Sequence, residues 1–194
     1  MQDSDLIMAC LKNDKTAKEE FFKTYFGKFS ALALRYSKNK EQSLEITNKG
    51  FAHLFSILNK FKSNGTINVD QWLRQEFLFF AVNQIRNIRS EYYVASTVRV
   101  NDLAEKSYDL FMDAELTDFK SISFDILVKS LQQLVPSQRL VFNLHIVENY
   151  DLIKIAEILE ASEQTVKSNF EKARFNLQKN IDKNNKSQKN EQFV

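Results

Sequence analysis

Apolar residues recur along most of this chain at the three- and four-residue spacing of an amphipathic α-helix. In the first half, this spacing predicts four helices. They run from Asp5 to Leu11, from about Thr16 to Tyr36, from about Glu41 to Phe61, and from Val69 or Trp72 to Arg89. Thr16 and Glu19 have the spacing of a capping box at the start of the second helix. The inward residues expected on the last three helices are Phe22, Tyr25 or Phe26, Phe29, Leu32 or Ala33, Tyr36, Leu44, Phe51, Leu54, Phe55, Leu58, Phe61, Leu73, Phe77, Phe80, Ala81, Ile85 and Ile88.

The segment from Leu131 to Leu177 has another pattern: two short helical runs and a tight turn precede one longer, partly basic run. Pro136 suits the first turn of a helix, because its missing N–H has no partner there in any case. Asp151 is the expected N-cap of the second short helix, and Ser162 that of the long one. The expected inward residues are Arg139, Val141, Phe142, Leu144, Val147, Ile155, Ala156, Ile158, Leu159, Val166, Phe170, Ala173 and Leu177. This order of elements is typical of a helix-turn-helix.

Glycine and proline are scarce, with 3 Gly and 1 Pro in 194 residues, so few strands are indicated and an all-α fold is expected. The 43% hydrophobic content is enough for sizeable cores. Between Asn101 and Asp125, seven acidic residues stand against two lysines, a local charge of about −5. We therefore expect two helical domains, at 1–93 and 129–180, joined by an acidic linker at 94–128 and followed by a disordered polar tail at 181–194.

Few side chains suit catalysis or metal binding. The chain has one cysteine, Cys10, and two histidines, His53 and His145, so no disulfide, metal-ligand cluster or nucleophile–base pair is indicated. Cys10 lies in an apolar run and is expected to be a small core residue. No segment approaches the roughly 20 apolar residues of a membrane span, and no export signal is evident. We expect a cytoplasmic protein that is not an enzyme and has no catalytic residue, metal or cofactor.

The face of the last helix opposite its apolar stripe combines amide, hydroxyl, acidic and basic side chains. They are Gln164, Lys167, Ser168, Glu171 and Lys172, with Arg174 on the flank. Such residues can contact base edges and phosphates of DNA. A solvated helix face has a similar composition, so the helix by itself leaves both interpretations open.

The pattern L-x-P-x-x-R-x-V-F-x-L, followed by IAE-x-L, TVKS and AR-x-x-L between Leu134 and Leu177, resembles the fourth conserved region of bacterial sigma factors. In that family the last helix docks in the major groove of the upstream promoter element. The resemblance implies this role for Ser162, Glu163, Gln164, Thr165, Lys167, Ser168, Glu171, Lys172 and Arg174. Two positions differ from the family, which commonly has Gly where this chain has Asn149 and Glu160. Glu adopts a left-handed conformation at a cost of about 1 kcal/mol or more.

The first half resembles the second conserved region of compact sigma factors that keep only regions two and four, the extracytoplasmic-function (ECF) type. The likeness includes the opening SDLIMACLKNDKTAKEEFFKTYF and the pairs Trp72-Leu73, Val82-Asn83 and Ile85-Arg86. It implies that the third helix binds core RNA polymerase, with candidate residues Glu45, Asn48, Lys49 and His53. Asn48 and Lys49 replace the family's usual Gln and acidic residue. The candidates for the downstream promoter element are Lys62, Ser63, Asn64, Thr66, Asn83, Arg86 and Arg89.

The resemblance as a whole implies a sigma factor, which binds core RNA polymerase and directs it to promoter DNA. An anti-sigma factor is a further implied partner, and a small-molecule substrate or membrane insertion is not expected. Two alternatives stay open. One is a stand-alone helix-turn-helix regulator, which would bind duplex DNA tightly without polymerase. The other is a helical interaction protein without promoter activity, an interpretation prompted by Lys49 and Glu160.

Overall fold

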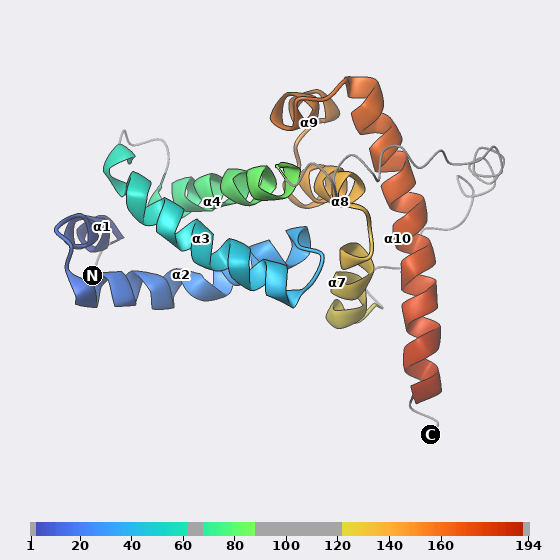
Figure 1. Cartoon of the computed structure of the whole chain (residues 1–194), viewed down its shortest axis with the longest axis horizontal. Helices are drawn as coiled ribbons and strands as arrows, with labels where there is room; N and C mark the ends of the chain where they lie inside the picture. Colours follow the sequence, from blue (N-terminus) through green and yellow to red (C-terminus); the bar gives the residue numbers. More distant parts are fainter. Residues whose placement is uncertain (1–2, 62–67, 88–121, 192–194) are drawn as a thin grey trace. The chain divides into compact units, whose positions relative to one another are not determined.

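The computed structural model describes residues 3–61, 68–87 and 122–191, and every regular element in these ranges is a helix (Figure 1). The all-α prediction is therefore confirmed. The chain divides into two compact units, Met1–Ile85 and Arg86–Val194. The segment Lys62–Thr66, which follows the third predicted helix, lies outside the described residues, as do residues 94–121 of the predicted acidic linker.

The N-terminal unit is built around stacked aromatic rings. Its elements are α1 (Asp3–Leu11), α2 (Lys15–Tyr36), α3 (Lys40–Ile57), the 3-10 turn η1 (Leu58–Lys60) and α4 (Val69–Arg86). The Phe29 ring of α2 stacks on Phe77 of α4, with centroids 4.5 Å apart, and lies 5.6 Å from Phe51 of α3. All three side chains are at most 3% exposed. These rings fix the three longest helices of the unit against one another.

Several sequence predictions for this unit were wrong by one or two positions along a helix. Asp14, not Thr16, is the N-cap of α2, and its carboxylate accepts hydrogen bonds from the amides of Thr16 and Ala17. Phe21 is fully buried, whereas Phe22 is 38% exposed. A pair of adjacent phenylalanines fits the same helical spacing, and both rings contact Phe51 of α3, but only Phe21 is also buried. Other misplaced residues are Leu44, which is exposed, and Phe80, which is half-buried while Leu78 and Val82 are buried.

The C-terminal unit comprises α7 (Phe124–Gln132), α8 (Pro136–Phe142), the π-helical turn η3 (Asn143–Val147), α9 (Leu152–Leu159) and α10 (Glu163–Glu191). Pro136 occupies the start of α8, as predicted. Val147 is 42% exposed, so its predicted inward position is wrong. The wider π-helical turn changes the angular spacing of the residues after α8 and turns Val147 outward. The core is formed by Ile126, Leu131, Leu134, Phe142, Ala173, Leu177 and Ile181.

Two predicted boundaries of this unit differ from the structure. Helix α7 begins at Phe124, inside the stretch assigned to the linker, and Ser123 caps it by accepting a hydrogen bond from the Ile126 amide. The prediction of a disordered tail from residue 181 is wrong, because α10 continues to Glu191. Ile181 is fully buried and extends the apolar stripe by one turn. Asn184 is 6% exposed and donates from its side-chain amide to the Ser130 hydroxyl, at 2.8 Å.

Arg139 is 1% exposed and connects α7 to α8. Its guanidinium donates to the backbone carbonyls of Leu134, at 2.7 Å, and Gln132, at 3.1 Å. These carbonyls lie at the end of α7 and in the following turn, where a helix leaves acceptors without partners. The inward prediction for Arg139 is confirmed, and its charge is matched by hydrogen bonds in the core.

Three other features of the described residues bear on function. Cys10 is buried, as predicted, and this burial raises the pKa of its thiol above the ordinary value. Among the helices that the structure describes, none is long and apolar enough to cross a membrane. The same residues contain no group of three or more His, Cys, Asp or Glu side chains that could hold a metal ion.

Gly50 lies where α3 approaches α4 closely, and a Cβ at this position would overlap the Phe77 ring. We expect Gly50→Ala to lower the free energy of unfolding by about 1–3 kcal/mol, because the stacked rings must move apart. Urea unfolding measures the difference. Gly27→Ala is the matched control, because a Cβ added at this position would meet no atom within 4 Å beyond its own helix and chain neighbours. This variant should raise the free energy of unfolding by about 0.5–1 kcal/mol. An unchanged stability of Gly50→Ala would contradict the close packing of α3 on α4.

Candidate nucleic-acid interface

The turn between α9 and α10 is held by two helix caps. The Asp151 carboxylate accepts from the Lys154 amide at 2.6 Å and starts α9, as predicted. The Ser162 hydroxyl accepts from the Thr165 amide at 3.1 Å and starts α10, also as predicted. Between them, Glu160 ends α9 in the left-handed conformation, with φ 52° and ψ 45°. The structure therefore demands at Glu160 a backbone conformation that glycine adopts without cost.

Helix α10 buries one stripe and presents the opposite one. Val166, Ala173 and Leu177 are buried, and Phe170 packs partly buried against the same core, as the sequence predicted. The nine candidate DNA-contacting residues lie on the first three turns of α10 or at its cap. Ser162, Glu163, Gln164, Thr165, Lys167 and Arg174 are exposed, and Ser168, Glu171 and Lys172 are half-buried. Burial of one stripe thus leaves the other accessible to a ligand.

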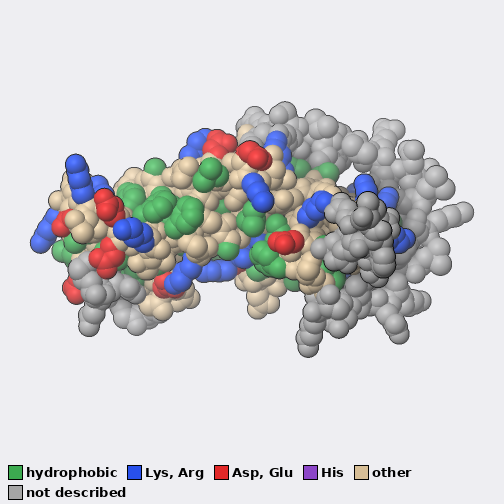
Figure 2. All heavy atoms as spheres, turned by 90° about the horizontal axis from the view of Figure 1, so that it is seen from below, with side chains coloured by type: hydrophobic (Ala, Val, Ile, Leu, Met, Phe, Trp, Pro, Cys, Tyr) green, Lys and Arg blue, Asp and Glu red, His purple; other side chains and the backbone are tan. Residues whose placement is uncertain are grey.

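Charge on this stripe is mixed. Lys167, Lys172 and Arg174 stand against Glu163 and Glu171, which leaves a small positive balance. On the face of the molecule that Figure 2 shows, Lys and Arg side chains are interspersed with acidic and hydrophobic ones. The chain carries a formal net charge of only +2. Attraction to nucleic acid must therefore come from local groups of cations and not from the charge of the whole chain.

The polymerase-binding candidates lie on one helix, α3 (Lys40–Ile57). Glu45, Asn48 and Lys49 are exposed, and His53 is half-buried with its ring stacked on Phe80 at 4.8 Å. Lys49 donates a hydrogen bond to Glu45 at 2.6 Å. This hydrogen bond and the charge of Lys49 lower the pKa of the Glu45 carboxyl. Lys49 therefore compensates the negative charge of Glu45 on this face.

The downstream-element candidates are only partly described. Asn83 is exposed on α4, and Arg86 is the last residue of that helix. Lys62, Ser63, Asn64, Thr66 and Arg89 lie outside the described residues. The structure therefore does not test whether these side chains form one surface.

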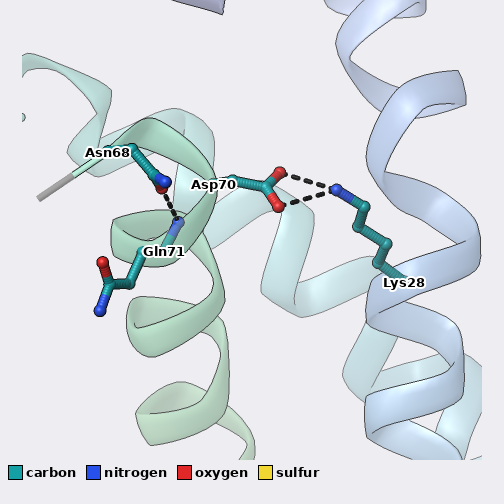
Figure 3. Close-up of polar contacts among 4 residues, drawn as sticks. All are labelled: Lys28, Asn68, Asp70 and Gln71. Atoms are coloured by element: carbon teal, nitrogen blue, oxygen red, sulfur yellow. Dashed lines mark hydrogen bonds and ion pairs between the residues drawn. The ribbon is translucent and has the colours of Figure 1, made fainter.

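A second group of charged residues was not predicted from the sequence. Lys28 and Arg35 of α2, with Asp70 and Arg74 of α4, line a cavity of about 260 Å³. Figure 3 shows the Lys28 ammonium facing both carboxylate oxygens of Asp70, each at 2.8 Å. The spacing of Lys28 and Arg35 does place them on one face of a helix. The contact with a residue 42 positions away could not be inferred from spacing.

Comparison with known families identifies the C-terminal unit. Residues 124–176 match the family model "Sigma-70, region 4". This segment of the chain is therefore similar in sequence to region 4 of the sigma-70 family. The match extends from the first residue of α7 into α10, so region 4 includes α7 and begins earlier than residue 129, the predicted start of the domain. No curated protein matches the chain.

Solved structures show a similar fold over most of the chain. The sigma factor RpoE, in complex with the anti-sigma factor NepR from Bartonella quintana, matches with a TM-score of 0.50 and 16% identity. The match covers 84% of this chain and 96% of that one, so the two proteins share a fold. CnrH, in complex with the cytosolic domain of CnrY, gives a TM-score of 0.43 at 15% identity, over 93% and 97% of the two chains. The predicted resemblance to two-domain ECF sigma factors is confirmed at the level of the fold.

The Ser162 cap is a testable determinant of the region 4 turn. We expect Ser162→Ala to lower the free energy of unfolding by about 1 kcal/mol, because the Thr165 amide loses its acceptor. Ser162→Asp keeps an acceptor oxygen and should keep the stability of the unchanged protein. Thermal unfolding followed by circular dichroism compares the three proteins. Equal losses in both variants would show that the hydroxyl does not act as a cap.

Proposed function

We propose that this chain is a promoter-specificity factor that binds core RNA polymerase and directs it to promoter DNA. The observation that carries the proposal is the exposed stripe of α10, presented by a unit whose sequence matches sigma-70 region 4. In this role the chain acts by binding and contributes no catalytic step. Because polymerase and chromosome are its partners, it would act in the cytoplasm.

The start of α10 is proposed to lie in the major groove of the upstream element. Gln164 and Ser168 have donor and acceptor atoms that suit base edges, and Glu171 can accept from a cytosine amine. Lys167, Lys172 and Arg174 suit the flanking phosphates. The Ser162 and Thr165 hydroxyls are hydrogen-bonded to each other at 2.8 Å, which fixes the geometry of the approach to DNA. Glu163, in the first turn of α10, completes the proposed contact set.

The N-terminal unit is proposed to serve both polymerase and the downstream element. Exposed residues of α3, namely Glu45, Asn48 and Lys49, with half-buried His53, form the proposed polymerase face. The Glu45–Lys49 ion pair makes this face electrically balanced instead of acidic. Binding there would depend on shape and hydrogen bonding more than on net charge. Lys62, Ser63, Asn64, Thr66, Asn83, Arg86 and Arg89 remain the proposed downstream contacts.

An anti-sigma protein is proposed as a further partner. The similarly folded RpoE was solved in complex with the anti-sigma factor NepR, which supports the idea that this fold can be bound in that way. Such a partner would compete with polymerase for the N-terminal unit or for region 4.

The DNA-binding role predicts a specific change in salt dependence. Lys167→Ala and Arg174→Ala should each reduce the slope of log affinity against log salt by about 0.9, because each removes one phosphate contact. Fluorescence anisotropy with duplex promoter DNA and the polymerase holoenzyme measures these slopes.

Lys179→Ala is the matched control for this experiment. Lys179 is an exposed lysine on the same helix, beyond the region 4 match, and its removal should leave the slope unchanged. If all three variants behaved alike, the stripe from Ser162 to Arg174 would not be the DNA-contacting surface.

Association with core RNA polymerase tests the proposed function as a whole. The purified chain should co-elute stoichiometrically with core polymerase from its own host. Glu45→Ala should weaken this complex, while Glu41→Ala, an exposed acid at the start of the same helix, should not. Tight binding of duplex DNA without any association with polymerase would favour the stand-alone regulator instead.

A further inference from the structure

Helix α10 carries a row of asparagine side chains beside its buried apolar stripe. They are Asn169, Asn176, Asn180 and Asn184, at spacings of seven, four and four residues. Residues at such spacings lie on one side of a helix, and each of the four is hydrogen-bonded to α7, to α8 or to the turn between them. We call these four residues the polar seam. It lies within the C-terminal unit and includes none of the residues proposed above for DNA contact.

The C-terminal end of the polar seam is its most buried part. Asn184 is 6% exposed, and its side-chain amide donates to the Ser130 hydroxyl at 2.8 Å and to the Gln133 side-chain carbonyl at 3.2 Å. Gln133 donates in return to the side-chain carbonyl of Asn184, at 3.4 Å. The Asn184 amide thus has both its donor and its acceptor atoms paired, as a buried amide requires.

The other members of the polar seam reach α7 and α8. Asn180 donates to the backbone carbonyl of Ser130 at 3.1 Å, and this carbonyl is one of the last four of α7, which a helix leaves without partners of its own. Asn176 donates to the side-chain carbonyl of Gln138 in α8 at 2.9 Å, and Gln138 is buried. The polar seam therefore ties α10 to both of the helices that pack along it (Figure 1).

Apolar contacts and hydrogen bonds constrain a helix differently. Burial of Ala173, Leu177 and Ile181 depends on area and has no direction, so it constrains the rotation of α10 about its own axis less sharply. A hydrogen bond requires its two heavy atoms within about 3.2 Å and nearly in line. Because a helix with its side chains is about 10–12 Å wide, a rotation of about 20° would move a side-chain tip by about 2 Å and break such a bond. A buried polar side chain can fix the register of packed helices for this reason.

Half of the polar seam lies beyond the segment that matches region 4. The match ends at residue 176, whereas Asn180 and Asn184 stand about one and two turns further along α10. We propose that Asn180 and Asn184 are positioning residues: they fix the rotation of α10 and thereby determine which side chains of its exposed stripe face a DNA groove. The consequence for DNA rests on the proposed function, whereas the fixed rotation of the helix does not.

Distances between two spin labels test the rotation without DNA. In the full chain, Cys10→Ala removes the single native thiol, and Lys129→Cys in α7 and Lys167→Cys in α10 provide two exposed labelling sites. With the polar seam intact, the labels should give one narrow distribution of distances. Circular dichroism verifies that each variant is folded.

The decisive variant removes both partners of the 2.8 Å hydrogen bond. In the combined Ser130→Ala, Asn184→Leu protein neither of these two buried side chains is left with an unpaired polar group, so the fold should be retained. Its distance distribution should shift or broaden by about 2 Å, as expected for a rotation of about 20°. Asn185→Leu makes the same change at the next position, where the side chain has no hydrogen bond to the described residues, and it should leave the distribution unchanged.

Sequence discrimination by the polymerase holoenzyme tests the consequence for DNA. The probes are the duplex that the unchanged holoenzyme selects from a random pool and a scrambled duplex of the same composition. The combined variant should lose about tenfold in the ratio of the two affinities, which corresponds to about one base contact. Its affinity for the scrambled duplex and its salt slope should not change, because phosphate contacts carry no sequence information. A merely structural role of the polar seam would instead lower both affinities together.

Asn180→Ala provides a milder variant in case the combined one does not fold. Asn180 is half-buried and alanine favours a helix, so this protein should fold and show changes in the same direction but smaller. Equal distance distributions, or equal affinity ratios, in the unchanged protein and the folded variants would overturn the proposal. Failure of the chain to form a holoenzyme would contradict the proposed function, and the label distances would still decide whether the polar seam fixes α10.

Discussion

Region 4 in this protein depends on a cation held inside an apolar core. The Arg139 side chain is almost fully buried, and its guanidinium joins the carbonyls of Gln132 and Leu134 from within α8. A buried charge is tolerated only where hydrogen bonds replace its water shell. The arginine therefore requires the end of α7 to stay next to α8. Helix α10 packs on both helices, so the presentation of its exposed stripe follows from this one contact.

The N-terminal unit reaches its stability by different means. The aromatic rings of Phe29 in α2, Phe51 in α3 and Phe77 in α4 pack together. Gly50 has no side chain, which allows α3 to approach the Phe77 ring of α4 closely. Stacked rings bury large areas and prefer defined geometries. With its core concentrated there, the unit can keep charged side chains such as Lys28 and Asp70 on its surface without weakening its interior.

The sequence predicted those features that depend on neighbouring residues. Asp151 and Ser162 accept hydrogen bonds from amides three positions on, and Pro136 suits a first helical turn because it lacks an N–H; the structure confirms all three. Features that depend on distant partners were missed. The periodicity could not choose between Phe21 and Phe22, because the spacing fits both and only the folded unit shows that Phe21 is buried. Asn184 looked like a residue of a polar tail, yet it is buried because Ser130 and Gln133 accept its amide hydrogens.

The same distinction between neighbouring and distant determinants applies to the candidate functional residues. The exposed stripe of α10 follows from its apolar stripe, so spacing was sufficient to place Lys167 and Arg174. The Lys28–Asp70 ion pair joins α2 to α4 through residues 42 positions apart, a relation that no local pattern contains. Five of the seven downstream-element candidates lie outside the described residues and stay predictions.

The length of α10 has a mechanical consequence. Its 29 residues contain neither glycine nor proline, and at about 1.5 Å per residue they form a rod of roughly 43 Å. Such a rod has no internal hinge. A tilt imposed on its first turns would swing the far end through an arc several times larger than the displacement at the turn. Helix α10 therefore acts as a rigid lever: a change in the orientation of its first turns produces a larger displacement of its C-terminal end.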